Sequence, residues 1–169
     1  ITLHVLKSHG ASVAVLRSEC AETPGIGWAP AVGSHTVDRA HEADAELVDI
    51  ARSEQFACRD VPEAILGSAL WCEPVFKGIY PELFLETRGR YLPDGWEADM
   101  ASISAPLDFC GLNIYSAAMR YSRDAAGGIR RRDQEDLGLA MPRTMFHWGV
   151  VPESLYWGPR FFHERYGLP

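Results

Sequence analysis

The sequence predicts an α/β protein in which short apolar strands alternate with amphipathic helices. Two segments, residues 26–32 (IGWAPAV) and 107–115 (LDFCGLNIY), have the length and the apolar residues that are typical of buried strands. A helical pattern follows each of them after a loop, and the second loop is the longer. This order is typical of β/α units, whose strands lie parallel and are covered on both faces.

Three helical regions are predicted around the first strand. Residues 2–20 carry apolar side chains at helical spacing, with Gly10 as a weak point. A second helix is predicted from residue 37 to about residue 56, with an apolar stripe and acidic residues that face water. Residues 61–77 are apolar enough to form a covered helix, which we expect Pro74 to break.

The second half of the chain is predicted to hold a strand, a polar loop and a final helix. A turn-rich stretch leads from residue 78 to the second strand, and residues 122–138 are expected to form a polar, glycine-containing loop. Within it, Arg130–Arg132 are followed at once by acidic residues, so we interpret this cluster as solvated. Pro152 is well placed for the first turn of a final helix. That helix is expected to bury three aromatic side chains, Trp157, Phe161 and Phe162.

Composition and charge argue against several classes of partner. The chain has 169 residues and a formal net charge of −7, which disfavours binding to nucleic acid or to an anionic membrane. No apolar stretch approaches the roughly 20 residues of a membrane span, and the first residues lack the pattern of a secretory signal. We therefore expect a cytoplasmic protein that forms a single segment with no internal boundary.

The cysteines and histidines do not indicate a metal site. The four cysteines are widely separated and form no C-x-x-C pair, so we expect reduced, half-buried thiols. The six histidines are scattered, and no H-E-x-x-H motif is present. We predict no metal and no cofactor.

The strand at residues 108–116, DFCGLNIYS, ends with two hydrogen-bonding side chains on one face. Because side chains alternate along a strand, Asn113 and Tyr115 point the same way and Ile114 points to the other side. At the carboxyl end of a parallel strand, this face is where α/β folds place their binding sites. The alternative is structural, with Asn113 capping the strand and Tyr115 packed in a core.

Four segments resemble the β-glucosidase family, glycoside hydrolase family 1. They are LKSHGASVAVLR (6–17), EPVFKGIYPE (73–82), the longer segment from LPDGWEADM to GLNIYS (92–116), and HWGVVPESLYWGPRFFHERYGLP (147–169). They occur in the order that the family shows and cover almost the whole chain. The strand motif and the P-E-S-L-Y-W segment are the most specific parts of the resemblance.

The resemblance implies part of a (β/α)8 TIM barrel, about strands five and six with their flanking helices. It also implies hydrolysis of β-linked glycosides with retention, which uses one glutamate as acid and base and another as nucleophile. In the family these glutamates lie in T-x-N-E-P and I-T-E-N-G segments, and neither segment occurs in this chain. We therefore expect no catalytic residue here and no hydrolysis by the isolated chain.

What the resemblance transfers is a set of supporting residues. Asn113 and Tyr115 match positions that orient the nucleophilic carboxylate, and Trp148 matches a tryptophan that binds substrate at the aglycone subsite. A core role beside Pro152 is the alternative for Trp148. His147 replaces a usual glycine, which puts the geometry of its loop in doubt.

A second class of function must be weighed against a piece of an enzyme. The chain could act as a non-catalytic sugar-binding or assembly module derived from the barrel. The expected partners are a β-glucoside or oligosaccharide substrate, and either the remainder of the barrel or a second copy of the chain. Three glutamates, Glu82, Glu86 and Glu97, are not assigned a catalytic role because none follows a predicted strand.

Overall fold

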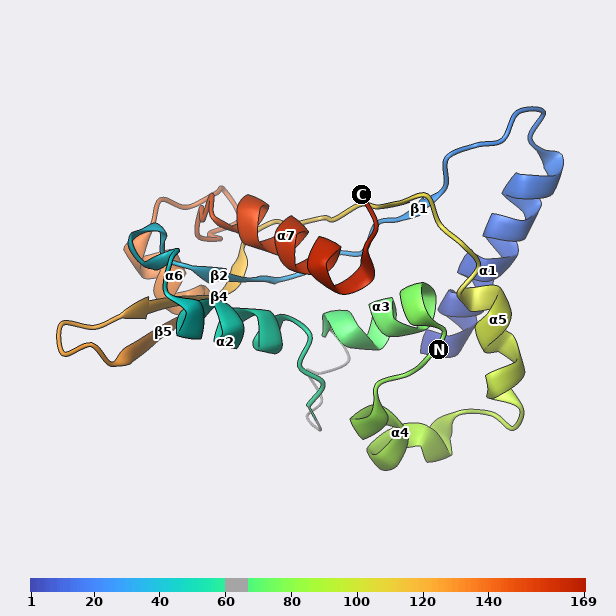
Figure 1. The fold of residues 1–169 in the computed structure, drawn as a ribbon, viewed down its shortest axis with the longest axis horizontal. Coiled ribbons are helices and arrows are strands. Elements are labelled where there is room, and N and C mark those ends of the chain that lie inside the picture. The colour runs from blue at the N-terminus through green and yellow to red at the C-terminus, as the bar shows by residue number, and fades with distance from the viewer. Residues whose placement is uncertain (60–66) are drawn as a thin grey trace. The chain divides into compact units, whose positions relative to one another are not determined.

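The structure, a computed structural model, describes residues 1–59 and 67–169, which fold into two compact units (Figure 1). The first unit is composed of Ile1–Pro30, Ala57–Gly111 and Leu168–Pro169, and the second of Ala31–Phe56 and Leu112–Gly167. Among the helices of these described ranges, none is both long enough and apolar enough to cross a membrane. The expectation of a single segment without an internal boundary stays a prediction.

The first unit is mainly helical. Its elements are α1 (Thr2–Glu19), β1 (Gly27–Trp28), α3 (Ser68–Lys77), α4 (Glu82–Arg88), η3 (Gly89–Tyr91), η4 (Trp96–Asp99), α5 (Met100–Ile103) and β3 (Phe109–Cys110). The helices bury one apolar cluster: Leu3, Leu6, Leu70, Val75, Tyr80, Met100 and Ile103. The prediction of a helix over residues 2–20 is confirmed by α1.

Gly10 of α1 is the place where another helix comes close. A Cβ atom at Gly10 would overlap the backbone carbonyl of Ser102 in α5. The missing side chain therefore allows α1 and α5 to pack backbone against backbone. The sequence showed the glycine, but only the tertiary contact explains it.

The prediction that Pro74 breaks its helix is wrong. Helix α3 continues through Pro74 to Lys77, and the part of this prediction that concerns residues 61–66 lies outside the described residues. The helix ends instead at Gly78, whose φ of 67° is in the left-handed region. The Gly78 N–H donates to the Pro74 carbonyl at 3.0 Å, which closes the last turn.

The two predicted strands are parallel, as expected, but short. Strand β1 pairs with β3 over only two residues of each, and a further bridge joins Ala31 to Asn113. Phe109 in β3 is 44% exposed, so the expected burial on both faces is not seen in this chain. These two segments are therefore strands only in part.

The second unit is built on a three-stranded sheet. Its elements are β2 (Ser34–Val37), η1 (Arg39–His41), α2 (Ala45–Gln55), β4 (Ala117–Arg123), β5 (Ile129–Asp133), α6 (Gln134–Ala140) and α7 (Ser154–Tyr166). The strand order is β2-β4-β5, with β2 parallel and β5 antiparallel to β4. Helices α2 and α7 both contact β2 and lie on its two sides (Figure 1).

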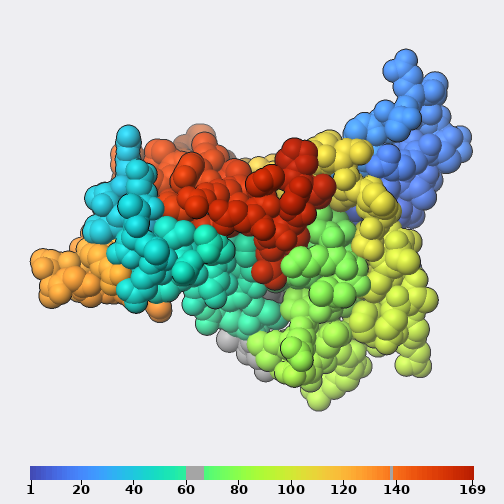
Figure 2. Space-filling view, viewed as in Figure 1, coloured from blue at the N-terminus to red at the C-terminus, as the bar shows by residue number. Residues whose placement is uncertain are grey.

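The prediction of a loop over residues 122–138 is wrong. This stretch holds the end of β4, the whole of β5 and most of α6. The Asp124 carboxylate accepts hydrogen bonds from the backbone N–H groups of Ala126 and Gly128, which closes a tight turn between the strands. The arginines of β5 are thus in an edge strand rather than a loop, and the orange tip of the hairpin projects in Figure 2.

The start of the second predicted helix is also wrong, whereas the aromatic core of the last helix is confirmed. Val37 ends β2, and α2 begins only at Ala45, where the Asp44 carboxylate caps it by accepting from Leu47 N–H at 3.2 Å. Pro152 precedes the first residue of α7 by two positions. The three aromatic residues of α7 that were predicted to be core are all buried: Trp157, Phe161 and Phe162.

Candidate functional site

The candidate site lies at the end of the strand segment that contains Asn113 and Tyr115. The Asn113 carbonyl accepts a hydrogen bond from Val32 N–H at 3.0 Å, which fixes this segment beside residues 31–32. Asn113 and Tyr115 are both exposed, and Tyr115 is exposed by 63%. The intervening Ile114 is half-buried, and its side chain lies against Gly158 of α7. The two polar side chains therefore stand away from the side that is packed against the helix.

Trp148 is carried by a tight loop of residues 142–150, which we call the Trp148 loop. Arg143 and Gly149 form an antiparallel bridge at its base. Inside the loop, Thr144 N–H donates to the Trp148 carbonyl at 2.9 Å. The Thr144 hydroxyl oxygen accepts from the N–H groups of Phe146 and Trp148, both at 3.3 Å. The backbone hydrogen bonds of Thr144 and the bridge at the base therefore hold the loop in one conformation.

His147 is the one residue of the described chain, glycines aside, with a positive φ angle, at 62°. This is the left-handed conformation that glycine adopts without strain. His147 N–H still donates to the Thr144 carbonyl at 2.9 Å, so the turn is closed. His147 thus adopts, in a closed turn, a backbone conformation that favours glycine.

Three aromatic rings meet beside the strand end. The Tyr115 and Trp148 ring centroids are 5.7 Å apart with planes tilted by 44°, and those of Phe146 and Trp148 are 5.2 Å apart. Phe146 is 67% exposed, and Trp148 is half-buried. We call these three residues the aromatic platform. The sequence pointed to Tyr115 and Trp148 separately and gave no role to Phe146.

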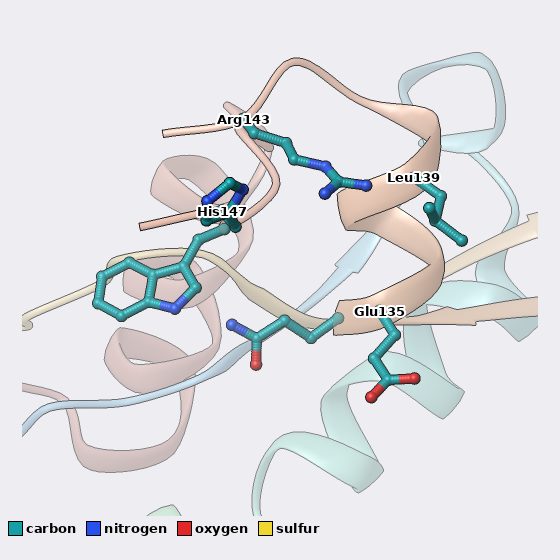
Figure 3. Close-up of a pocket in the computed structure, with 6 residues that line it drawn as sticks. Glu135, Leu139, Arg143 and His147 are labelled. Atoms are coloured by element: carbon teal, nitrogen blue, oxygen red, sulfur yellow. The ribbon is translucent and has the colours of Figure 1, made fainter. Parts of the chain in front are cut away.

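Beside Trp148 lies a hollow of about 460 Å³ that opens between α6 and the Trp148 loop (Figure 3). It is lined by Gln134, Glu135, Leu139, Arg143, His147 and Trp148. Arg143 extends its guanidinium group from the loop toward the helix that carries Glu135 and Leu139 (Figure 3). The hollow combines an indole ring with a guanidinium, an amide and a carboxylate.

Charged groups fix the start of the same strand in the first unit. Asp108 accepts from Ile26 N–H at 2.8 Å and pairs with Arg17 at 3.1 Å. These hydrogen bonds, the one from Ile26 first, hold the pKa of Asp108 below its ordinary value. Burial raises the pKa of the neighbouring Cys110 thiol to about 11, so this thiol is protonated at neutral pH.

Acidic side chains are few around the hollow. Glu135 is the one carboxylate among the residues that line the hollow. The three glutamates left unassigned from the sequence, Glu82, Glu86 and Glu97, lie in the first unit on α4 and η4. Across residues 1–59 and 67–169 there is no group of three histidine, cysteine or acidic side chains that could hold a metal ion.

Known proteins with similar sequences include β-glucosidases. One relative, β-glucosidase A of Thermotoga maritima, is 35% identical over 101 residues, which is 59% of this chain and 22% of that protein. A β-glucosidase of an Agrobacterium species is 28% identical over 173 residues, which is 98% of this chain and 33% of that protein. The chain thus spans at most about a third of the length of these two relatives.

Similar folds are found in the same group of proteins. The β-glucosidase of Thermotoga maritima in complex with noeuromycin superposes with a TM-score of 0.64 and 28% identity, and covers 99% of this chain and 34% of its own. The structure of the same enzyme with castanospermine gives a TM-score of 0.63. These neighbours are (β/α)8 barrels, and the described residues form part of such a fold without a closed barrel. Residues 3–169 also match the family described as glycosyl hydrolase family 1, and the chain therefore belongs to that family.

Proposed function

We propose that this chain is part of a retaining β-glucosidase and forms one wall of its sugar site. The observation that carries the proposal is the pairing of two aromatic rings. Tyr115 lies at the end of a parallel strand segment, and the centroid of its ring is 5.7 Å from that of Trp148. The two glutamates that a retaining mechanism needs lie, on this proposal, outside the 169 residues. By itself the chain is then inactive.

Tyr115 and Asn113 act as positioning residues in this proposal. A tyrosine hydroxyl that donates a hydrogen bond to a carboxylate holds it in one orientation and favours its ionised form. The nucleophile of a retaining glycosidase must be ionised when it attacks the anomeric carbon. Because Tyr115 is largely exposed, its side chain is accessible to a carboxylate supplied by another segment.

Trp148 acts on the leaving-group side of the scissile bond. A half-buried indole offers an apolar face to the C–H face of a sugar ring or to an aryl group. The hydrogen bonds of Thr144 fix the backbone under this ring, so little conformational freedom is lost when a ligand stacks on it.

A non-catalytic sugar-binding module is the second candidate function. It is favoured by the hollow beside Trp148, which offers a single carboxylate, whereas retention needs two carboxyl groups roughly 5 Å apart. Both candidates predict that sugars bind at the aromatic platform. They differ in whether a catalytic pair is supplied by other segments.

The test is the effect of Tyr115→Phe in the assembled protein that contains this chain. We expect kcat for 4-nitrophenyl β-D-glucopyranoside to fall by about 10- to 100-fold, since a hydrogen bond to a charged group is worth about 1.5–3 kcal/mol. Tyr156→Phe, at an exposed tyrosine on α7, is the matched control and should have no effect. Equal activities of the two variants would contradict the role of Tyr115.

A second measurement separates the two candidates. The 169-residue chain has a mass of 18.8 kDa, and its native mass shows whether it assembles with further chains. The proposal expects no hydrolysis of the aryl glucoside by the purified 18.8 kDa chain and hydrolysis by a larger assembly or a longer protein. An assembly that binds glucosides but never cleaves them would favour the binding module.

A further inference from the structure

Strand β5 leaves one edge of the sheet in the second unit open. The strand order is β2-β4-β5, so β5 pairs with β4 on one side and, within the described residues, with no strand on the other (Figure 1). Three consecutive residues of this strand are arginines, Arg130–Arg132, in a chain whose formal net charge is −7. We propose that this edge binds an extended acidic segment of a partner protein, which adds an antiparallel strand to the sheet.

The hairpin that joins β4 to β5 fixes which backbone groups face the open edge. Asp124 N–H donates to the Gly128 carbonyl at 2.9 Å, so these two residues form a hydrogen-bonded pair. In an antiparallel ladder such pairs recur at every second residue, and the next one joins Ser122 to Arg130. Arg131 lies between two such pairs, so its N–H and carbonyl groups point to the open edge. An added antiparallel strand would exchange two hydrogen bonds with Arg131.

Arg130 and Arg132 bring two positive charges to one face of β5, because side chains alternate along a strand. Within residues 1–59 and 67–169 neither guanidinium forms an ion pair. On β4, Arg120 lies directly opposite Arg132, but its charge is met by Glu153 at 3.0 Å and Asp38 at 3.3 Å. Two carboxylates that are two residues apart on an added strand would therefore lie beside two unpaired positive charges.

The other face of β5 favours a different side chain. Arg131 lies on that face, with its guanidinium carbon 5.9 Å from the centroid of the Tyr121 ring. It borders a hollow of about 660 Å³ whose other lining residues belong to α2: Glu46, Asp49, Ile50, Ser53 and Glu54. Three of these side chains are carboxylates, which favour a basic residue opposite Arg131. The edge thus fits a segment with an acidic, a basic and a second acidic residue in succession.

The same charges disfavour two other occupants. A second copy of β5, paired with the first about its central residue, would bring arginine against arginine, and like charges directly opposite destabilise a pair of strands. A nucleic acid strand would meet the carboxylates of α2 beside Arg131, and it has no peptide N–H and carbonyl groups to complete the sheet. An acidic peptide strand satisfies both the backbone and the arginines of β5.

The experiment is a titration of the fluorescein-labelled peptide TVEKEVT with the 169-residue chain, followed by fluorescence polarisation. We expect saturable binding that weakens by about 3- to 10-fold when both glutamates of the peptide are replaced by glutamine, because two exposed ion pairs are lost. Raising NaCl from about 50 to about 300 mM should also weaken it. The arginines of β5 neither line the hollow beside Trp148 nor belong to the aromatic platform, so this result does not depend on the proposed function.

A charge reversal tests the arginines. The double variant Arg130→Glu/Arg132→Glu should lose binding of TVEKEVT and gain binding of TVKKKVT, in which both glutamates are lysines. The matched control is Arg39→Glu/Arg90→Glu, which makes the same change in net charge at two exposed arginines outside β5 and should keep the peptide preference of the wild type. Equal behaviour of the two double variants would overturn the proposal.

A change in the peptide alone tests the backbone pairing. Methylation of the backbone nitrogen of the central lysine removes the N–H that donates to the Arg131 carbonyl, and we expect binding to weaken by about 3- to 10-fold. Methylation at a flanking glutamate alters an N–H that points away from β5 and should have less than about a 2-fold effect. Equal effects of the two methylations, no saturable binding of TVEKEVT, or tighter binding of a single-stranded DNA of similar length would each overturn the proposal.

Discussion

The two units of this chain differ in how they are held together, and the candidate site stands on only one of them. The first unit is a set of helices around a buried apolar cluster. The second is a three-stranded sheet with helices packed on it, and it holds Asn113, Tyr115 and Trp148. A binding surface needs side chains that project from a fixed backbone, which a hydrogen-bonded sheet and its loops provide.

Each unit also has its own key contact. In the first unit, Gly10 allows α1 to approach α5 closely. In the second, the buried Trp157 of α7 donates a hydrogen bond from its indole N–H to the Val37 carbonyl of β2 at 3.0 Å. The packing of the helical unit thus needs the absence of a side chain at Gly10, whereas the packing of the sheet unit needs the large side chain of Trp157. Substitutions at these positions test this contrast.

The largest effect is expected for Trp157→Ala in the second unit. The ring is 1% exposed, so its removal leaves a cavity and an unsatisfied carbonyl at Val37. We expect the free energy of unfolding, measured with urea, to fall by about 3–5 kcal/mol. Leu155→Ala on the exposed side of the same helix should change it by less than about 0.5 kcal/mol. Similar losses for the two variants would refute the anchoring role.

Gly10→Ala, in the first unit, should have the next largest effect on the free energy of unfolding. The added methyl group would overlap the Ser102 carbonyl, which is backbone and cannot move aside as a side chain can. We expect a loss of about 1–3 kcal/mol in the free energy of unfolding. Gly89→Ala is the control, because Gly89 has a helical φ of −53° and its nearest neighbour is 3.9 Å away. A neutral Gly10→Ala would show that α1 and α5 do not pack closely.

His147→Gly should act in the opposite direction. Because His147 is exposed and has a φ of 62°, glycine removes backbone strain at the expense of few contacts. We expect the free energy of unfolding to rise by about 0.5–1 kcal/mol. Met145→Gly, at an exposed residue of the same loop without a positive φ, should lower it slightly. A loss of stability in His147→Gly would mean that the imidazole has a structural contact.

The smallest effects on stability are expected when two aspartates, one in each unit, are replaced by asparagine. The pKa of Asp44 is lowered mainly by its hydrogen bond with Arg123, and that of Asp108 mainly by Ile26 N–H. An asparagine can still accept from a backbone N–H but cannot form an ion pair, so Asp44→Asn should lower the Tm more than Asp108→Asn. At pH 7 we expect a drop of about 1–4 °C for Asp44→Asn.

The stabilisation by these two carboxylates should depend on pH in a defined direction. A carboxyl group with a lowered pKa in the folded state stabilises the protein above its unfolded pKa, and this contribution is lost as the pH falls through the folded pKa. The difference in Tm between wild type and Asp44→Asn should therefore be constant above about pH 5 and shrink below about pH 4. Thermal unfolding followed by circular dichroism between pH 3 and 7 measures it. A difference in Tm that grew on acidification would contradict a lowered pKa of Asp44 in the folded protein.

The sequence predicted the two units unequally well. Helix α1 and the aromatic core of α7 follow from apolar periodicity, because one face of each is buried. Strand β5 has no such signal, because four of its five side chains are exposed and its place in the sheet depends on pairing with β4. The four-residue strand β2 was likewise not predicted, and it overlaps the predicted helix only at Val37.

The candidate site was predicted in its residues but not in its arrangement. Asn113 and Tyr115 were selected by alternation along a strand, and these two residues and Trp148 also by a family resemblance. The match of residues 3–169 to the family confirms that resemblance. Their roles in the site stay predictions. The contact between Tyr115 and Trp148, the contribution of Phe146 and the hollow beside α6 were not predicted.

The amino-acid sequence by itself determined the family, the α/β class and the helices that bury an apolar face, because motifs and periodicity are local properties. The tertiary structure alone decided why residue 10 is a glycine, how His147 takes a left-handed conformation in the Trp148 loop, and which side chains line the hollow. Each of these depends on atoms from distant parts of the chain or on a backbone angle set by several hydrogen bonds. Such information is absent from any single stretch of residues.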